Sequence, residues 1–196
     1  QVTIYNTELF KKAGIAKPPT TYAELASVAK QVKEKTGKFA FFVTFVPEDS
    51  AEVLQSLVQM GVTLVDDRGK AAFNTDQGKA AFQYWVDLYK NGLLPQDVLV
   101  QGHRRAIELY QAGETALLGS GPQFLKAIAE NAPSIGAASA AAPQITGESG
   151  KKTVAVMNLV VPRDSKRPDD AVKFALYVTN SQNQLAFAKA ANVLPS

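Results

Sequence analysis

The side chains that usually carry out catalysis are sparse in this sequence. It has one histidine, His103, and no cysteine, which excludes disulfides, thiolate metal sites and cysteine nucleophiles. His103 stands beside two arginines, and we expect it at the surface. The acidic pairs Asp66-Asp67 and Asp169-Asp170 occur in a turn and at a helix start, where solvation and the helix dipole explain them. We therefore expect no enzyme activity, no metal and no cofactor.

Phosphate and nucleic-acid chemistry are also unsupported. The segment 119–123 reads Gly-Ser-Gly-Pro-Gln and lacks the Lys-Ser/Thr that grips phosphate in a phosphate-binding loop. The net charge is +3 and the pI about 9.0, but the basic residues are scattered and form no stripe with interleaved aromatic residues. No apolar run approaches the roughly 18 residues of a membrane span. We expect neither a nucleic-acid partner nor a transmembrane segment.

Local signals divide the chain into strands and helices. Gln1–Tyr5 alternates polar and apolar residues like a strand already under way, without an initiator Met or a leader, so we expect an internal start. Gly14 ends a first short helix, and Thr21 with Glu24 forms a capping box for the second. The later elements are a strand at 39–46, a helix at 50–60, a hairpin at 62–73, helices at 75–91 and 104–112, a strand at 115–118, a helix at 123–131, an extended segment at 135–143, a strand at 153–161 and helices at 168–178 and 181–191. Their alternation indicates the α/β class.

Several segments, in this order and spacing, carry a family resemblance over nearly the whole chain. They are Ile4–Ile15 with Pro18–Leu25, Phe73–Gly92, Tyr110–Leu118 with Gly121-Pro122, Ile135–Pro143 with Met157–Pro162, and Ser165–Val178 with Gln184–Pro195. Together they resemble the extracellular solute-binding proteins that deliver sugars and oligosaccharides to ATP-binding-cassette importers. The resemblance implies a periplasmic binding protein-like type II fold, in which two α/β lobes are joined by hinge strands.

This chain matches only part of that fold. By the resemblance, residues 1–5 form a hinge strand, 6–133 the second lobe, and 134–196 the hinge return and part of the first lobe. The start of the first lobe and the C-terminal helices of the family have no counterpart, so we expect a truncated chain. The resemblance also implies a periplasmic or extracellular location, with a lipid anchor on a missing N-terminus as one option.

The family binds its solute between the lobes and closes around it, and the membrane permease recognises the closed form. Sugars need aromatic rings to stack on and polar side chains for their hydroxyls. By the resemblance, the residues expected to contact solute are Phe45, Glu48, Asp49, Gln59, Met60, Gln123, Phe124, Met157 and Asn158. For Phe45 and Phe124 the competing interpretation is core packing, and for Glu48 and Asp49 a solvated helix start. Trp85 is expected in the core.

Other functions remain open. Gln123 stands where relatives place a stacking Trp, which leaves room for a non-sugar solute such as a polyol, an opine or an anion. A carboxylate-dependent glycoside hydrolase would need two acids about 5–10 Å apart across a cleft. A domain used only for protein interaction is a third alternative.

Overall fold

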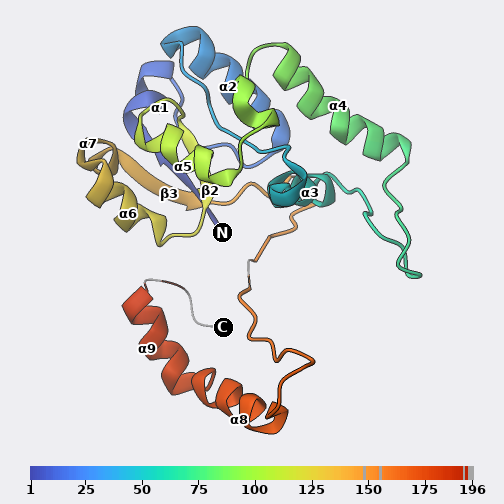
Figure 1. Cartoon of the computed structure of the whole chain (residues 1–196). Coiled ribbons are helices and arrows are strands. Elements are labelled where there is room, and N and C mark those ends of the chain that lie inside the picture. The colour runs from blue at the N-terminus through green and yellow to red at the C-terminus, as the bar shows by residue number, and fades with distance from the viewer. Residues whose placement is uncertain (148, 155, 192, 194–196) are drawn as a thin grey trace.

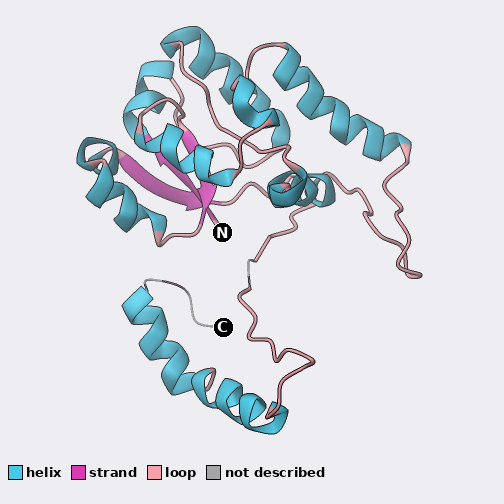
Figure 2. Ribbon diagram, in the orientation of Figure 1, coloured by secondary structure: helices cyan, strands magenta, loops and turns pink. Residues whose placement is uncertain are grey.

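The computed structural model describes residues 1–147, 149–154, 156–191 and 193. Most helices surround a small sheet, and two helices at the end of an extended segment lie apart from it (Figures 1 and 2). The elements are β1 (Val2–Asn6), α1 (Thr7–Ala13), α2 (Tyr22–Thr36), η1 (Pro47–Asp49), α3 (Ala51–Gln59), α4 (Asp76–Lys90), η2 (Gln96–Leu99), α5 (His103–Gln111), β2 (Leu117–Ser120), α6 (Phe124–Asn131), α7 (Pro133–Ala137), β3 (Ser139–Pro143), α8 (Pro168–Val178) and α9 (Ser181–Ala191). The predicted α/β class is confirmed.

The sheet has three strands in the order β2-β1-β3, with β1 antiparallel to both neighbours. Ile4 in β1 pairs with Leu118 on one side and with Ala141 on the other. Both edges of β1 are therefore hydrogen-bonded, and Ile4 is fully buried. The strand predicted at the start of the chain is confirmed as the centre of the sheet.

The first two helices begin and end where local chemistry predicts. The Asn6 side chain accepts hydrogen bonds from the Glu8 and Leu9 N–H groups at 3.1 and 3.0 Å, which caps α1. Gly14 ends α1 in the left-handed conformation, with φ 74°. Thr21 and Glu24 form the predicted capping box of α2. These contacts fix where both helices begin and where α1 ends.

The strand predicted at 39–46 is wrong in its extent. A single parallel bridge joins Phe39 to Thr115, and no ladder follows it. The Leu117 N–H still donates to the Ala40 carbonyl at 2.7 Å, after which the segment leaves the sheet and runs toward η1. Its apolar residues are nevertheless buried, including Phe42. The β-branched and aromatic composition reflects burial of this segment rather than strand pairing.

The predicted hairpin at 62–73 is reduced to one antiparallel bridge, Val65 to Ala71. The Asp66 carboxylate shapes its turn by accepting hydrogen bonds from the Arg68 and Lys70 N–H groups, both at 2.9 Å. Farther along, part of the segment predicted as extended at 135–143 is helical. Pro133 occupies the first turn of α7, where its missing N–H costs nothing, so the extended backbone begins only at β3.

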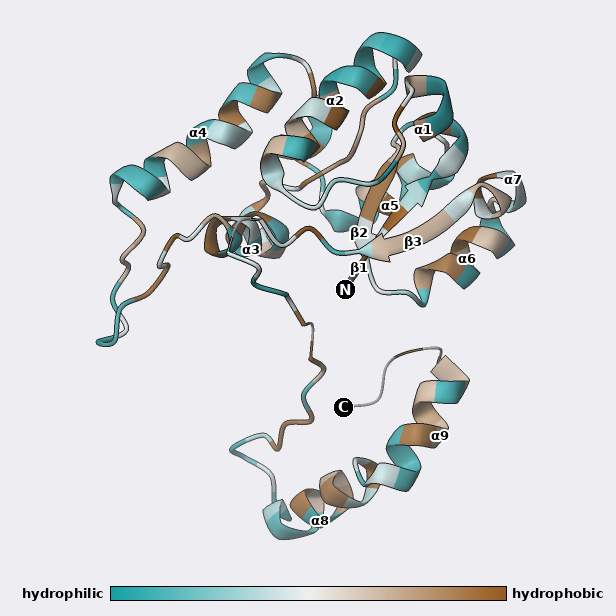
Figure 3. Cartoon of the chain, turned by 180° about the vertical axis from the view of Figure 1, so that it is seen from behind, coloured by the Kyte–Doolittle hydropathy of each residue, from teal (hydrophilic) through white to brown (hydrophobic). Residues whose placement is uncertain are grey.

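The strand predicted at 153–161 is not found in the part of that range that the structure describes. Met157 and Val160 are 80% and 81% exposed, because no described segment lies alongside to pair with them. Helices α8 and α9 are confirmed, but they too expose apolar residues such as Phe174. Figure 3 shows these hydrophobic positions on both helices, away from the rest of the chain.

Candidate functional site

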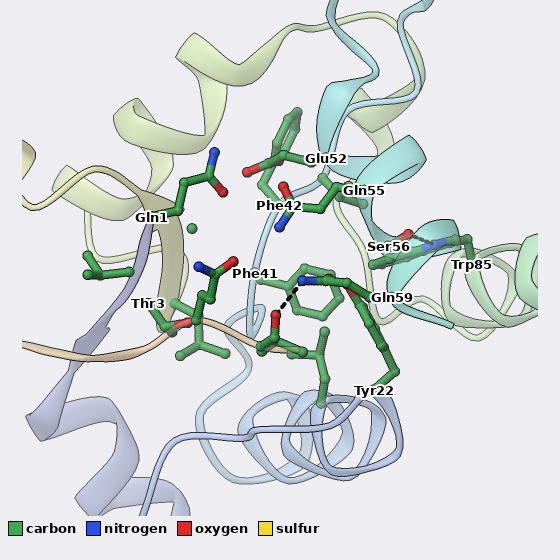
Figure 4. A pocket seen from close by; sticks show the side chains of 17 residues that line it. Gln1, Thr3, Tyr22, Phe41, Phe42, Glu52, Gln55, Ser56, Gln59 and Trp85 are labelled. Carbon is green, nitrogen blue, oxygen red and sulfur yellow. Dashed lines mark hydrogen bonds between the residues drawn. The ribbon is translucent and has the colours of Figure 1, made fainter. Parts of the chain in front are cut away.

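A pocket opens between β1, α3, the segment 41–43 and the chain that follows β3 (Figure 4). It holds about 650 Å³ when its open mouth is included. Its lining residues are Gln1, Val2, Thr3, Tyr22, Leu25, Phe41, Phe42, Val43, Glu52, Gln55, Ser56, Gln59, Trp85, Leu117, Gly119, Gln144 and Ile145.

Buried aromatic side chains form the floor of this pocket. The Trp85 ring meets Phe41 and Tyr22 edge to face, with ring centroids 5.8 and 6.1 Å apart. The Trp85 indole N–H donates to the Ser56 hydroxyl at 2.9 Å, which fixes the ring against α3. Trp85 is 3% exposed, as expected for a core residue. The floor is therefore a packed part of the core and is held rigidly.

Polar side chains surround this floor. Glu52 and Gln55 lie one helical turn apart on α3, and Figure 4 shows both pointing toward the space that Gln1 also faces. A carboxylate accepts hydrogen bonds, and an amide both donates and accepts. Glu52 is the one carboxylate among the described lining residues, whereas a glycosidase needs two. This rim suits neutral, hydroxyl-bearing molecules.

Gln59 lines the same pocket, but its side-chain amide is already hydrogen-bonded to other groups of the protein. Its Nε2 donates to the Ile145 and Lys151 carbonyls at 2.8 and 3.0 Å, and the Tyr22 hydroxyl donates to its Oε1. Burial, followed by the charge of Glu52, raises the pKa of Tyr22, which keeps its hydroxyl a donor. Gln59 is 1% exposed and joins α3 to the segment after β3.

His103 lies next to the pocket rim rather than on an open surface. Its Nδ1 is 3.5 Å from Glu52 Oε1, and its backbone N–H donates to Asp49 Oδ2 at 2.6 Å. The Glu52 carboxylate, with Asp49 as a second negative charge, raises the pKa of His103 against the opposing effect of burial. The predicted surface position of His103 is therefore corrected to a half-buried one.

The family model for bacterial extracellular solute-binding proteins matches residues 1–185. The chain belongs to this family. It is 28% identical to a Deinococcus radiodurans protein named Probable ABC transporter-binding protein, over 100% of this chain and 49% of that one. Both the family and this relative are named as binding proteins and not as enzymes.

Solved structures of this solute-binding family share the fold. A candidate oligosaccharide periplasmic-binding protein from Synechococcus sp. MITs9220, crystallised with zinc, is 50% identical with a TM-score of 0.96, covering 100% of this chain and 49% of that one. Maltose-bound MalE3 from Thermotoga maritima is 24% identical with a TM-score of 0.76, covering 99% of this chain and 51% of that one. The chain spans about half the length of these relatives, and the partial periplasmic binding protein fold is confirmed.

Of the predicted contact residues, Gln59 lines the pocket, and Met60 is the next residue along the chain. Phe45 packs on Trp85, with ring centroids 6.3 Å apart. Glu48 and Asp49 form η1 outside the described lining. The remaining residues lie farther along the chain: Gln123 and Phe124 at the start of α6, and Met157 and Asn158 exposed in the extended segment.

Sequence reasoning missed Glu52 and Gln55. Their signal was present, because Val53 and Leu57 mark the buried face of α3 and leave Glu52 and Gln55 on another face. Among the described residues, no group of three or more His, Cys, Asp or Glu side chains is arranged to hold a metal ion. No described helix has the length and apolar character needed to cross a membrane.

Proposed function

We propose that the full-length protein is the solute-binding component of an ATP-binding-cassette importer and that this pocket is one side of its binding site. The observation that carries the proposal is the rim of Glu52 and Gln55 above a rigid aromatic floor, in a chain of the solute-binding family. Such a surface can bind a polar solute with little rearrangement of its floor, because the aromatic rings there are already packed together.

The solute is a sugar or an oligosaccharide. Carboxylate and amide groups together can pair with hydroxyls that both donate and accept. A relative described as oligosaccharide-binding, 50% identical to this chain, supports this class. An anion fits less well, because Glu52 is negative and the described lining contains no Lys or Arg side chain. A polyol is the alternative that the same rim would accept.

Two lobes close on the solute in this proposal. Residues 1–5 are a hinge strand, 6–133 the second lobe, and 134–196 the hinge return with part of the first lobe. The exposed apolar residues of 156–160, α8 and α9 support this division, since a packed lobe would cover them. Solute that contacts both lobes favours the closed state, and the permease recognises that state.

The site also includes residues that lie outside the pocket lining. We assign Gln123 and Phe124 at the start of α6, with Phe45, Glu48, Asp49, Met60, Met157 and Asn158, to contacts made when the lobes close. Gln59 contributes indirectly, because its amide holds the Ile145 and Lys151 carbonyls and the Tyr22 hydroxyl in place. The protein works outside the cytoplasmic membrane, either free in the periplasm or held by a lipid anchor that lies outside these residues.

A thermal-shift screen of the full-length protein tests the solute class. Mono- and oligosaccharides, polyols, amino acids and anions are added singly, and a ligand bound only by the native state raises Tm. We expect the largest rise with a saccharide. A rise with anions alone would refute the proposed class. With the identified solute, Gln123→Ala should weaken binding, and an unchanged affinity would remove Gln123 from the site.

A further inference from the structure

His103 carries a buried polar atom without a regular partner. Its Nδ1 is inaccessible to solvent and forms no hydrogen bond with the described residues. The nearest acidic atom is Glu52 Oε1, at 3.5 Å, just beyond hydrogen-bond distance. A small rotation of either side chain would close this gap. The arrangement is that of an ion pair that tightens when the imidazole is protonated.

The backbone holds the imidazole in this place. Asp49 Oδ2 accepts the His103 N–H at 2.6 Å, which ties the start of α5 to η1. A Cβ at position 102 would lie 2.6 Å from the same oxygen, so Gly102 allows this close approach. His103 therefore keeps its ring beside Glu52 through contacts that do not involve the ring.

The charges around His103 have the sign that favours its protonated form. Glu52 on α3 and Asp49 on η1 both face it, and both are negative. The two arginines that follow His103 on α5 form ion pairs with other acids. Arg105 pairs with Asp97 at 2.7 Å, and Arg104 pairs with Glu108 at 3.8 Å. Gly119 on β2 also approaches this carboxylate, and a Cβ at position 119 would lie 3.4 Å from Oε1, an ordinary van der Waals distance.

We propose that His103 is a positioning residue for Glu52: the protonated ring holds Oε1, so that Oε2 stays directed at the pocket and accepts solute hydroxyls. This rests on the proposed function of the pocket. When His103 is neutral the carboxylate loses this restraint and gains rotamer freedom, which binding must then remove. Solute affinity should therefore fall several-fold as pH rises through the titration of His103.

The first test uses the full-length protein without solute. NMR follows the imidazole resonances with pH, and the resonance that His103→Gln removes identifies His103. We expect Glu52→Gln to lower the pKa of His103, because a nearby negative charge is lost. Glu108→Gln, which removes an acid paired with the neighbouring arginines, should leave it unchanged. Equal values in the wild type and in Glu52→Gln would overturn the proposal.

The second test measures binding of maltose by calorimetry at about pH 5.5 and about pH 8.5, on either side of an ordinary histidine pKa. The wild type should bind more tightly at the lower pH, Arg104→Gln should keep this difference, and His103→Gln should abolish it. Equal wild-type affinities would overturn the positioning role. So would Zn²⁺ binding that both Glu52→Gln and His103→Gln abolish, since the pair would then be a metal site. If maltose does not bind, the saccharide that raises Tm most in the thermal-shift screen takes its place; if no saccharide binds, the proposed solute class fails, and the first test still decides the pairing.

Discussion

Glu52 and Gln59 lie about two helical turns apart on α3 and use their polar atoms in different ways. The Gln59 amide is bonded to Ile145, Lys151 and Tyr22 and so stabilises the fold. The Glu52 carboxylate faces the pocket, and His103 is its neighbour on the other side. Substitutions at the two positions should therefore separate stability from binding.

Replacement of Gln59 should cost stability. Gln59→Leu leaves the Ile145 and Lys151 carbonyls and the Tyr22 hydroxyl without the buried amide that bonds them, so we expect the free energy of unfolding of the full-length protein to fall by about 2 kcal/mol. Urea unfolding measures the change. Gln55→Leu on the same helix, with a half-exposed side chain, is the matched control and should change stability by no more than about 0.5 kcal/mol. A neutral Gln59→Leu would mean that water replaces these bonds.

Replacement of Glu52 should cost affinity. Glu52→Gln removes the charge that strengthens hydrogen bonds to solute hydroxyls, and we expect Kd for the identified solute to rise about 10-fold. Calorimetry on the full-length protein gives the value. Glu108→Gln, on the distant part of α5, should bind like the wild type. If Glu52→Gln binds as tightly as the wild type, Glu52 is not a solute contact.

The His103 pair should make stability depend on pH. Because the folded state raises the pKa of His103, the pair stabilises the protein fully below about 6.5, the unfolded value, and this contribution is lost as pH rises through the folded pKa. The stability difference between wild type and His103→Gln should thus be larger at acidic than at alkaline pH, by chemical unfolding. In a Glu52→Gln background this difference should shrink. Parallel pH curves for wild type and His103→Gln would contradict the pairing.

At the scale of elements, α2 depends on its capping box. The Thr21 hydroxyl accepts the Glu24 N–H at 3.2 Å, and the Glu24 carboxylate accepts the Thr21 N–H at 3.2 Å. The same helix presents Leu25 and Tyr22 to the pocket, so its first turn positions part of the floor. A local contact on the outside of the helix thereby supports the site.

Loss of this cap should destabilise the protein. Thr21→Ala leaves the Glu24 N–H without its acceptor, and we expect a loss of about 1 kcal/mol in the free energy of unfolding. Thr63→Ala, at an exposed position away from helix ends, is the control and should be close to neutral. Thermal and urea unfolding measure both. Equal stabilities of the two variants would show that the Glu24 carboxylate alone maintains the cap.

At the scale of the whole molecule, apolar side chains lie exposed far from the sheet. They include Val160, Phe174 and Phe187, and Figure 3 shows the last helices standing clear of the rest of the chain. Isolated exposed apolar residues are common, but a group over adjoining elements indicates a surface that packs on something else. In our proposal the first lobe covers it.

This packing can be tested in the full-length protein. Phe174→Asp would place a charge in the covered surface, and we expect stability to fall by at least about 2 kcal/mol. Val100→Asp is the control, because Val100 is 73% exposed on the main body. Urea unfolding compares the two. Similar stabilities would mean that α8 does not pack against the first lobe.

Local sequence signals determined much of the helical structure of this protein. Gly14 and the Thr21–Glu24 pair placed helix ends correctly, because caps and left-handed glycines act within a few residues. The strands were less well predicted. Residues 39–46 and 153–161 have strand composition, but a strand also needs a neighbour, and the first segment keeps one bridge while the described part of the second has none.

The family followed from motifs in the sequence, whereas the arrangement of the pocket was decided by tertiary structure. Gln59 was expected to contact solute, but its amide bonds carbonyls 86 and 92 residues away, which no local pattern reveals. In the same way, Glu52 acquires His103 as a neighbour only when α5 packs beside α3. The physical reason is that side-chain hydrogen bonding depends on distances in space, while helix ends depend on the residues next in sequence.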